Sequence, residues 1–143
     1  MSNLTIQYTE SEIDKIFNKL ISSDNDLRLQ FEEYIKKEYA DQSEKLNYMD
    51  ICKISEYIID RVLKSETQTL DDIFDNVEEI LNSCDTYTEN LIVIGLFEGI
   101  QNIRGSKIDY YFGFNKWLKP QSKLKWDALI DSWEGVDWRK SKR

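Results

Sequence analysis

Apolar side chains recur every three or four positions through most of this chain, which is the spacing of one face of an α-helix. The first such segment ends near residue 21, and Thr9 and Glu12 have the spacing of a capping box that begins a helix there. The polar residues 22–24 interrupt the pattern. A second predicted helix covers residues 26–40, with its apolar side chains on one face.

Two further helices are predicted in the middle of the chain. Asn47 is expected to cap the third, with Asp50 in the first turn, where the helix dipole favours a negative charge. Thr69 and Asp72 open the fourth in the same way. The fourth helix has the clearest apolar stripe, which consists of Leu70, Ile73, Phe74, Val77, Leu81 and Cys84.

The segment 88–104 is apolar on nearly all sides, which is typical of a helix buried at the centre of a domain. A β-strand is the competing interpretation, because β-branched residues cluster at 92–94. Its length and the helical spacing of its later apolar residues favour the helix. Gly95 and Gly99 lie four positions apart, so we expect a neighbouring helix to pack closely against them.

The last third of the chain begins with an aromatic-rich segment at 110–117, which predicts irregular structure. A final helix is expected from Pro120, a residue favoured in the first turn, to a stop at Gly135. We predict one all-α domain over residues 1–138, a bundle of six to seven helices around the buried helix at 88–104. Residues 139–143 are predicted to form a basic, flexible tail.

Composition fits this fold and narrows the kind of partner. A chain of 143 residues is long enough for one domain to bury a core without metal ions or disulfide bonds. Its net charge of −8 disfavours nucleic acid and anionic membranes, and it favours basic partners. No segment has the pattern of a signal peptide or a membrane span, so we expect a cytoplasmic protein. Cys52 and Cys84 are interpreted as reduced, buried thiols.

The sequence offers little for catalysis. It contains no histidine, the commonest general base near neutral pH, and none of the common nucleophile, phosphate-binding or zinc motifs. We therefore expect no enzyme, no cofactor and no metal ion. One alternative remains open, because Glu56 and Asp60, and likewise Asp127 and Asp131, stand four residues apart and could hold a divalent cation. A solvated helix face also explains these pairs.

A run of acidic residues is the strongest functional signal. No lysine or arginine occurs between Lys64 and Arg104, so these carboxylates cannot form ion pairs within their own segment. Like charges one helical turn apart destabilise a helix, so we expect a basic partner to supply the missing counter-charges. Alternatively, lysines or arginines from other helices fold over the run, or water screens it. The predicted partner-binding residues are Asp71, Asp72, Asp75, Glu78, Glu79, Asp85 and Glu89.

Aromatic residues supply a second candidate surface. Tyr110 and Tyr111 are predicted to be exposed in a loop, and tyrosine is common at the centres of protein interfaces. The four tryptophans are interpreted mainly as core residues. Lysines interleave with these aromatics at 116–125, a pattern that also occurs in RNA-binding proteins. The acidic charge of the whole chain argues against direct nucleic-acid binding.

Two stretches carry a family resemblance. The sequence ENLIVIGLFEGIQN at 89–102 contains an L-x-E-x-I-Q-N motif, and 118–135 contains S-x-x-x-W-x-x-L followed by a second tryptophan. Across 88–135 the chain resembles small acidic all-helical bacterial immunity proteins of toxin systems, including contact-dependent growth inhibition. The resemblance implies a protein that binds and blocks a cognate toxin, often a basic nuclease. Its motif residues are those of packing and capping, so it assigns no contact residue.

Three functional hypotheses follow. The first is an immunity protein that neutralises a basic, nuclease-type bacterial toxin. The second is a helical adaptor or a nucleic-acid mimic that binds a basic host protein, which acidic residues spread over several helices would favour. The third is a carboxylate-metal enzyme.

Overall fold

The structure is a computed structural model that describes residues 2–41, 44–102 and 108–141, and the side chains from 12 to 140 within these ranges. The described residues form helices and turns without a strand, which confirms the all-α prediction. They form seven helices, within the predicted six to seven, when the uninterrupted helical rod at residues 86–102 is counted as one. The elements are α1 (Ser2–Ile21), α2 (Asn25–Glu38), α3 (Asn47–Leu63), α4 (Leu70–Ser83), α5 (Thr86–Asn90), the π-helix η1 (Leu91–Phe97), α6 (Glu98–Asn102), α7 (Pro120–Glu134) and α8 (Trp138–Ser141).

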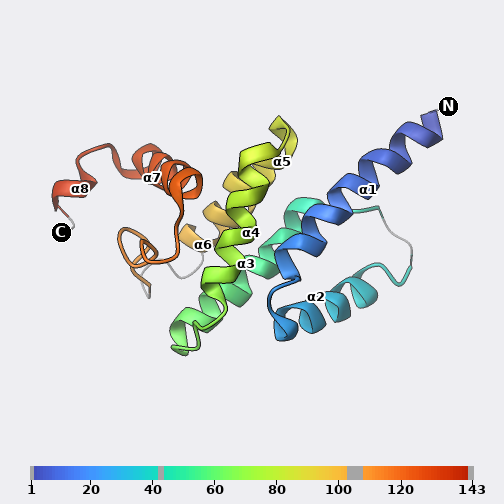
Figure 1. Ribbon diagram of the computed structural model, residues 1–143, viewed down its shortest axis with the longest axis horizontal. Coiled ribbons are helices and arrows are strands. Elements are labelled where there is room, and N and C mark those ends of the chain that lie inside the picture. The colour runs from blue at the N-terminus through green and yellow to red at the C-terminus, as the bar shows by residue number, and fades with distance from the viewer. Residues whose placement is uncertain (1, 42–43, 103–107, 142–143) are drawn as a thin grey trace.

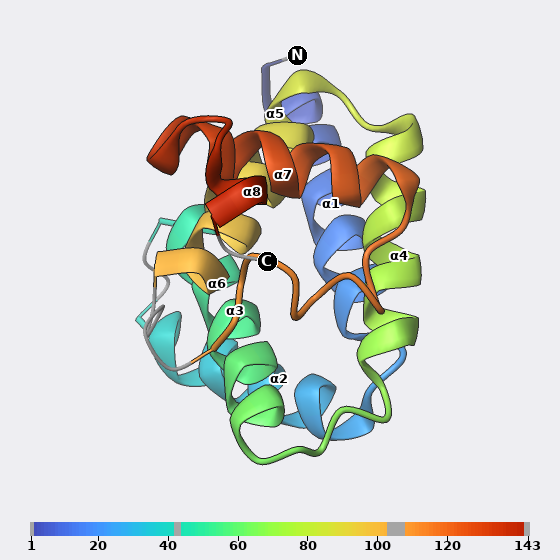
Figure 2. The same ribbon diagram turned by 90° about the vertical axis from the view of Figure 1, so that its left-hand side faces the viewer.

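The helices lie in three groups along the long axis of the molecule. Figure 1 shows α1 and α2 at one end, α7 and α8 at the other, and α3, α4 and the rod of α5, η1 and α6 between them. Figure 2 looks at the molecule from the α7 end, with α7 in front of that rod and beside α4. The rod therefore holds the central position predicted for the segment 88–104, and residues 103–104 lie outside the described ranges.

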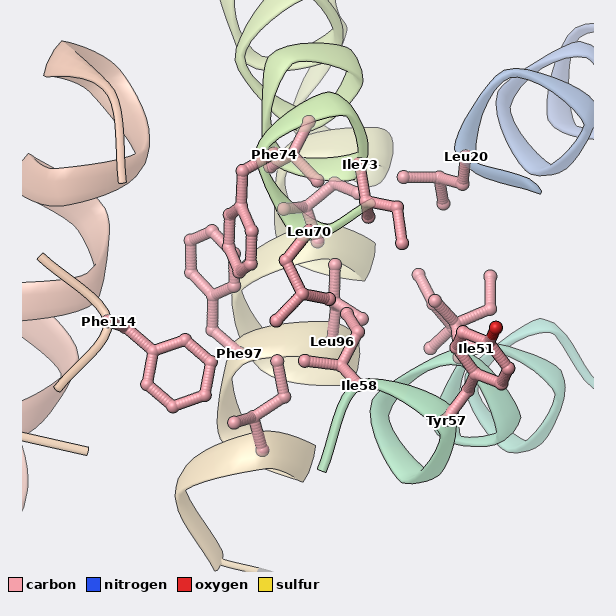
Figure 3. Packing of buried hydrophobic residues seen from close by; sticks show 14 of the residues in the cluster. Leu20, Ile51, Tyr57, Ile58, Leu70, Ile73, Phe74, Leu96, Phe97 and Phe114 are labelled. Carbon is pink, nitrogen blue, oxygen red and sulfur yellow. The ribbon is translucent and has the colours of Figure 1, made fainter. Parts of the chain in front are cut away.

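The core is formed where α3, α4 and the rod meet, with Leu20 of α1 and Phe114 of the segment before α7 on either side (Figure 3). Trp126 and Ile130 of α7 also belong to this core. The predicted stripe of α4 is largely confirmed, since Leu70, Ile73, Phe74 and Val77 are fully buried. Ile80, rather than the predicted Leu81, completes the buried face. Burying a side chain of this size contributes about 1.5–3 kcal/mol, so the continuous stripe anchors α4 firmly.

Two glycines let α3 approach the rod, as predicted. A Cβ atom added at Gly99 would lie 2.6 Å from Ser55 Oγ, and one added at Gly95 would lie 2.6 Å from Ile51 Cγ2. Ser55 Oγ also donates a hydrogen bond to the carbonyl oxygen of Leu96 at 2.9 Å. The small residues therefore form a packing seam.

Buried carboxylates hold the helix ends together. Asp24 caps α2 by accepting the Leu27 N–H at 2.9 Å, and it also accepts hydrogen bonds from the hydroxyls of Tyr57 and Thr69. The prediction that Thr69 caps α4 with its own side chain is therefore wrong, because that hydroxyl is directed to Asp24. One buried charge thus ties the α1–α2 connection to α3 and α4, as expected for a carboxylate that must be compensated when it leaves water.

Asp50 is a second buried carboxylate, only 2 % exposed. Its oxygens accept hydrogen bonds from the hydroxyls of Tyr34 and Tyr39 at 2.8–2.9 Å. The expected cap by Asn47 is also absent, since α3 begins at Asn47 itself and Leu46 precedes it without a side-chain cap. Asp50 lies in the first turn of α3, as predicted, and its hydrogen bonds to the two tyrosines also join α2 to α3.

Two predicted boundaries differ from the structure. Helix α1 begins at Ser2, well before the capping box expected at Thr9, and the side chains of residues 2–11 lie outside the described set. At the other end, Arg139 lies in α8 and pairs with Asp131 at 3.1 Å, so the expected flexible tail does not begin at 139. Trp138, 2 % exposed, packs against Tyr111 and Phe112 and fastens this end to the domain.

Candidate functional site

The acidic run predicted to bind a partner lies on the outer side of α4 and on the segment that follows it. The apolar stripe of α4 faces the core, so its carboxylates are directed outwards. Asp71, Asp72, Asp75 and Glu79 are exposed, and Glu78 is half-buried. Asp85 precedes α5 and is exposed, whereas Glu89 lies within α5 and is half-buried.

A lysine from the start of α7 lies across the first turns of this acidic face. Lys119 Nζ is 2.6 Å from Asp71 Oδ1 and 3.2 Å from Asp75 Oδ1. The hydrogen bond to Asp71, with that to Asp75, raises the pKa of Lys119 above its ordinary value despite partial burial. The two carboxylates therefore already have a counter-charge within the fold.

Glu78 has a structural role. Its two carboxylate oxygens accept the backbone N–H groups of Gln121 and Ser122 at 2.7 and 2.8 Å. These are orphan donors in the first turn of α7, where the helix dipole also favours a negative charge. Glu78 thus acts as a cap for α7 supplied by another helix, and its assignment to partner binding stays a prediction.

The remaining predicted carboxylates are also engaged, with one exception. Lys19 Nζ on α1 lies 2.5 Å from Glu79 Oε2, and Lys125 Nζ on α7 lies 3.4 Å from Glu89 Oε1. Asp85 caps α5 by accepting the Thr88 N–H at 2.8 Å, and this bond lowers the pKa of Asp85. Among the described residues, only Asp72 of the seven has neither a hydrogen bond nor an ion pair. The expectation that the fold leaves these carboxylates unpaired is therefore wrong.

Pairing reduces the negative charge of this surface without cancelling it. Seven carboxylates meet three lysines, Lys19, Lys119 and Lys125, so four negative charges remain in excess. The carboxylates of Asp71, Asp72 and Asp75 lie within 4.8 Å of one another, and all three are exposed. The nearby ammonium of Lys119 supplies there the positive charge that a cation would otherwise bring.

The carboxylate pairs considered for a metal ion are ion-paired to their neighbours. Asp60 pairs with Lys64 at 3.2 Å, and Asp127 pairs with Lys123 at 2.7 Å. The other members of the two pairs behave alike, since Glu56 pairs with Lys53 and Asp131 with Arg139. These contacts are those of solvated helix faces, which was the other interpretation of the pairs.

The two tyrosines predicted as exposed contact residues are half-buried packing residues. Tyr110 and Tyr111 stack with ring centroids 4.4 Å apart, and both hydroxyls donate to Glu134 on α7. Burial and the neighbouring Glu134 raise the pKa of both tyrosines. The backbone carbonyl of Tyr110 also accepts the indole N–H of Trp126 at 2.8 Å. The loop is therefore fastened to α7, and the expectation that these tyrosines are exposed is wrong.

Sequence reasoning did not anticipate a groove between α1 and α4. It has a volume of about 700 Å³ and is lined on one side by α1 and on the other by the end of α4 and the start of α5. Glu79 and Asp85, both in the predicted acidic run, lie along it together with Glu12 from α1. The helical spacing of Glu12, Ile16 and Lys19 signals a shared face in the sequence, but not which helix would lie opposite.

An exposed apolar surface also escaped the sequence analysis. Tyr48 at the start of α3 lies near Tyr87 of α5, and the two rings meet edge to face at 6.2 Å. Ile94 of η1 is 47 % exposed, and its neighbour Gly95 lies against Tyr48. Only the fold brings these residues, about forty positions apart, together.

Together these features define an all-helical, acidic domain whose negative surface is centred on α4. A family model described as "Domain of unknown function (DUF7674)" matches residues 17–134, and the chain belongs to this family. No curated protein and no solved structure matches the chain. Within the described residues, every helix is too short or too polar to cross a membrane.

Proposed function

We propose that this chain is a cytoplasmic inhibitor of the immunity-protein kind, which binds and neutralises a basic bacterial toxin of nuclease type. One observation carries the proposal. The seven carboxylates on and beyond α4 keep an excess of four negative charges after the three lysines that pair with them are counted. The net charge of −8 over the whole chain supports the same partner chemistry.

The proposed contact differs from the one that the sequence favoured. A partner would meet an acidic surface already partly paired, so its lysines or arginines would compete with Lys119 and Lys19 for Asp71, Asp75 and Glu79. Exposed ion pairs contribute about 0.2–1 kcal/mol each, so exchanging them costs little. Complementary charge of this kind accelerates association more than it raises affinity.

The second candidate is a nucleic-acid mimic or helical adaptor that binds a basic host protein. The observation that favours it is the spread of carboxylates over several helices, since Glu12 of α1 and Asp85 before α5 line the same groove as Glu79 of α4. A mimic is expected to bind a DNA-binding protein in competition with DNA, whereas an immunity protein is expected to be selective for one toxin.

The test mixes the purified chain with the toxin encoded immediately upstream of its gene. A stoichiometric complex and loss of toxin activity are the expected results, and the absence of a complex contradicts the proposal. Reversal of Asp71, Asp72 and Asp75 to lysine should slow association about tenfold or more and flatten its salt dependence. The matched control reverses Glu33, Glu56 and Glu66, which are exposed on α2, on α3 and in the α3–α4 connection.

A further inference from the structure

The groove between α1 and α4 combines charged walls with an apolar floor. Ile80 is buried and Ile16 and Cys84 are half-buried, and these three side chains give the groove its apolar lining. Glu12 and Glu79 also line the groove, and both are exposed. The groove is therefore an amphipathic surface.

The charge of the groove stays negative after the neighbouring lysines are counted. Glu12, Glu79 and Asp85 supply three carboxylates, whereas two ammonium groups stand against them, that of Lys19 in the lining and that of Lys15, which pairs with Glu12 at 3.3 Å. Lys19 Nζ lies 2.5 Å from Glu79 Oε2, so a lysine head group already binds at one wall. Both side chains remain accessible, with 40 % and 64 % of their surface exposed, so an external cation can reach the same carboxylate.

From this arrangement we propose that the groove binds a lysine- or arginine-bearing segment of a partner protein. Lysine and arginine place a charged head at the end of an apolar stem, and this division matches carboxylate walls above an apolar floor. This inference rests on the proposed function, because it identifies the segment of a basic partner that the acidic surface receives. Nucleic acid does not fit, since its phosphates would face the same carboxylates.

Arg139 and Lys140, the described basic residues nearest the C-terminus, do not fill the groove. They belong to α8, which lies at the opposite end of the molecule from α1 (Figure 1). Arg139 is also paired with Asp131 there. We therefore assign the groove to a segment of another protein.

The test uses a fluorescein-labelled peptide of alternating arginine and leucine, with citrulline in place of arginine as the uncharged control. The triple variant Glu12→Gln, Glu79→Gln, Asp85→Asn removes the groove's carboxylates, and asparagine at position 85 retains the helix cap. Fluorescence anisotropy should show binding to the wild type and about tenfold weaker binding to this variant. The matched control Glu33→Gln, Glu56→Gln, Glu66→Gln removes the same charge elsewhere and should bind as the wild type does.

Cys84 reports whether the peptide lies in the groove itself. In a Cys52→Ser background, the arginine peptide should slow alkylation of Cys84, and the citrulline peptide should leave the rate unchanged. The inference is overturned if the arginine peptide does not bind, or if the citrulline peptide binds equally well. It is also overturned if the control variant weakens binding as much as the groove variant does, or if Cys84 is not protected. If the wild type and the groove variant bind the toxin equally well, only this site is overturned. If the wild type forms no complex with the toxin, the inhibitor proposal itself is overturned.

Discussion

The carboxylate of Glu78 on α4 accepts the backbone N–H of Ser122 on α7 at 2.8 Å, across 44 positions of sequence. Its second oxygen accepts the N–H of Gln121 at 2.7 Å. A helix of the acidic surface thus supplies the cap of another helix, and Lys119 returns a positive charge to the same surface. The contacts that dock α7 against α4 therefore also neutralise part of the negative charge of α4.

Replacement of Glu78 by alanine should lower the free energy of unfolding by about 1.5–3 kcal/mol, because two charge-assisted hydrogen bonds are lost at a half-buried helix start. Glu78→Gln should cost less, since the amide retains one acceptor oxygen. Urea denaturation measures both effects. The comparison is Glu79→Ala, one position along and exposed, which should cost less than about 1 kcal/mol. Equal losses at the two positions would contradict the capping role.

The pKa of Asp24 governs part of the acid sensitivity. Burial alone would raise that pKa, but hydrogen bonds from Thr69, from the Leu27 backbone and from Tyr57, with the nearby charge of Arg61, outweigh it. The pKa lies below its ordinary value of 3.8 in the folded state. The stabilisation is therefore fully present above pH 4 or so, and it is lost as pH falls through the lowered pKa.

Tyr57→Phe should remove one of these bonds and raise the folded-state pKa of Asp24 towards its unfolded value. At pH 7 we expect a loss of about 1–2 kcal/mol in unfolding free energy. The difference from the wild type should shrink as pH falls below 4, where Asp24 becomes protonated in both proteins. Thermal or urea unfolding across pH 3–7 checks this. Tyr48→Phe serves as the control, and a pH-independent difference for Tyr57→Phe would refute the argument.

The close approach of α3 to the rod predicts that Gly99→Ala is destabilising. The new Cβ would meet Ser55, and overpacking of this kind costs about 1–3 kcal/mol. The higher helix propensity of alanine offsets roughly 0.5–1 kcal/mol of that cost. In a double-mutant cycle, Ser55→Gly should remove most of the penalty, because it deletes both contacting atoms. If urea titrations show that the effects of the two substitutions simply add, the new Cβ does not clash with Ser55.

Lys119→Gln tests the pairing on α4. The variant leaves Asp71 and Asp75 without their lysine, so its free energy of unfolding should fall by about 0.5–1 kcal/mol at low salt. The loss should diminish at 1 M salt, where charge interactions are screened within about 3 Å. Lys36→Gln, on an exposed position of α2, should change stability little at either salt concentration. A salt-independent loss would mean that Lys119 acts through packing.

Trp138→Ala tests whether α8 belongs to the folded domain. The ring is 2 % exposed, and its indole N–H donates to Asp131 at 2.6 Å. Its removal should lower the unfolding free energy by about 3 kcal/mol, as for other buried large side chains. Val136→Ala, two positions earlier and 65 % exposed, should cost under about 0.5 kcal/mol. A small effect at Trp138 would place this end outside the cooperative unit.

Helix positions could be predicted because they depend on local periodicity. The apolar stripe of α4 and the start and stop of α7 at Pro120 and Gly135 are visible within a few turns of sequence, and the structure confirms them. Helix starts were less predictable. Asp50 and Thr69 stand at positions typical of first-turn and capping residues, yet their partners are Tyr34, Tyr39 and Asp24 on other elements.

The candidate site illustrates the same division. The sequence correctly places the carboxylates on one side of α4, because helical spacing fixes which residues share a face. It could not reveal their partners, since Lys119 lies 48 positions from Asp71, and Lys19 belongs to α1. Pairing across such distances depends on how the helices dock.

The π-helix η1 is a place where the length of this chain can change. Its wider winding accommodates a residue that a regular α-helix of the same rise would not hold. Loss of one residue between Leu91 and Phe97 would return the rod to α-helical winding, and Thr88 would keep its place in the core relative to Ile100. The same loss inside α3 would turn one end of that helix by about 100° relative to the other. A deletion is therefore tolerated better in η1 than in a regular helix of this domain.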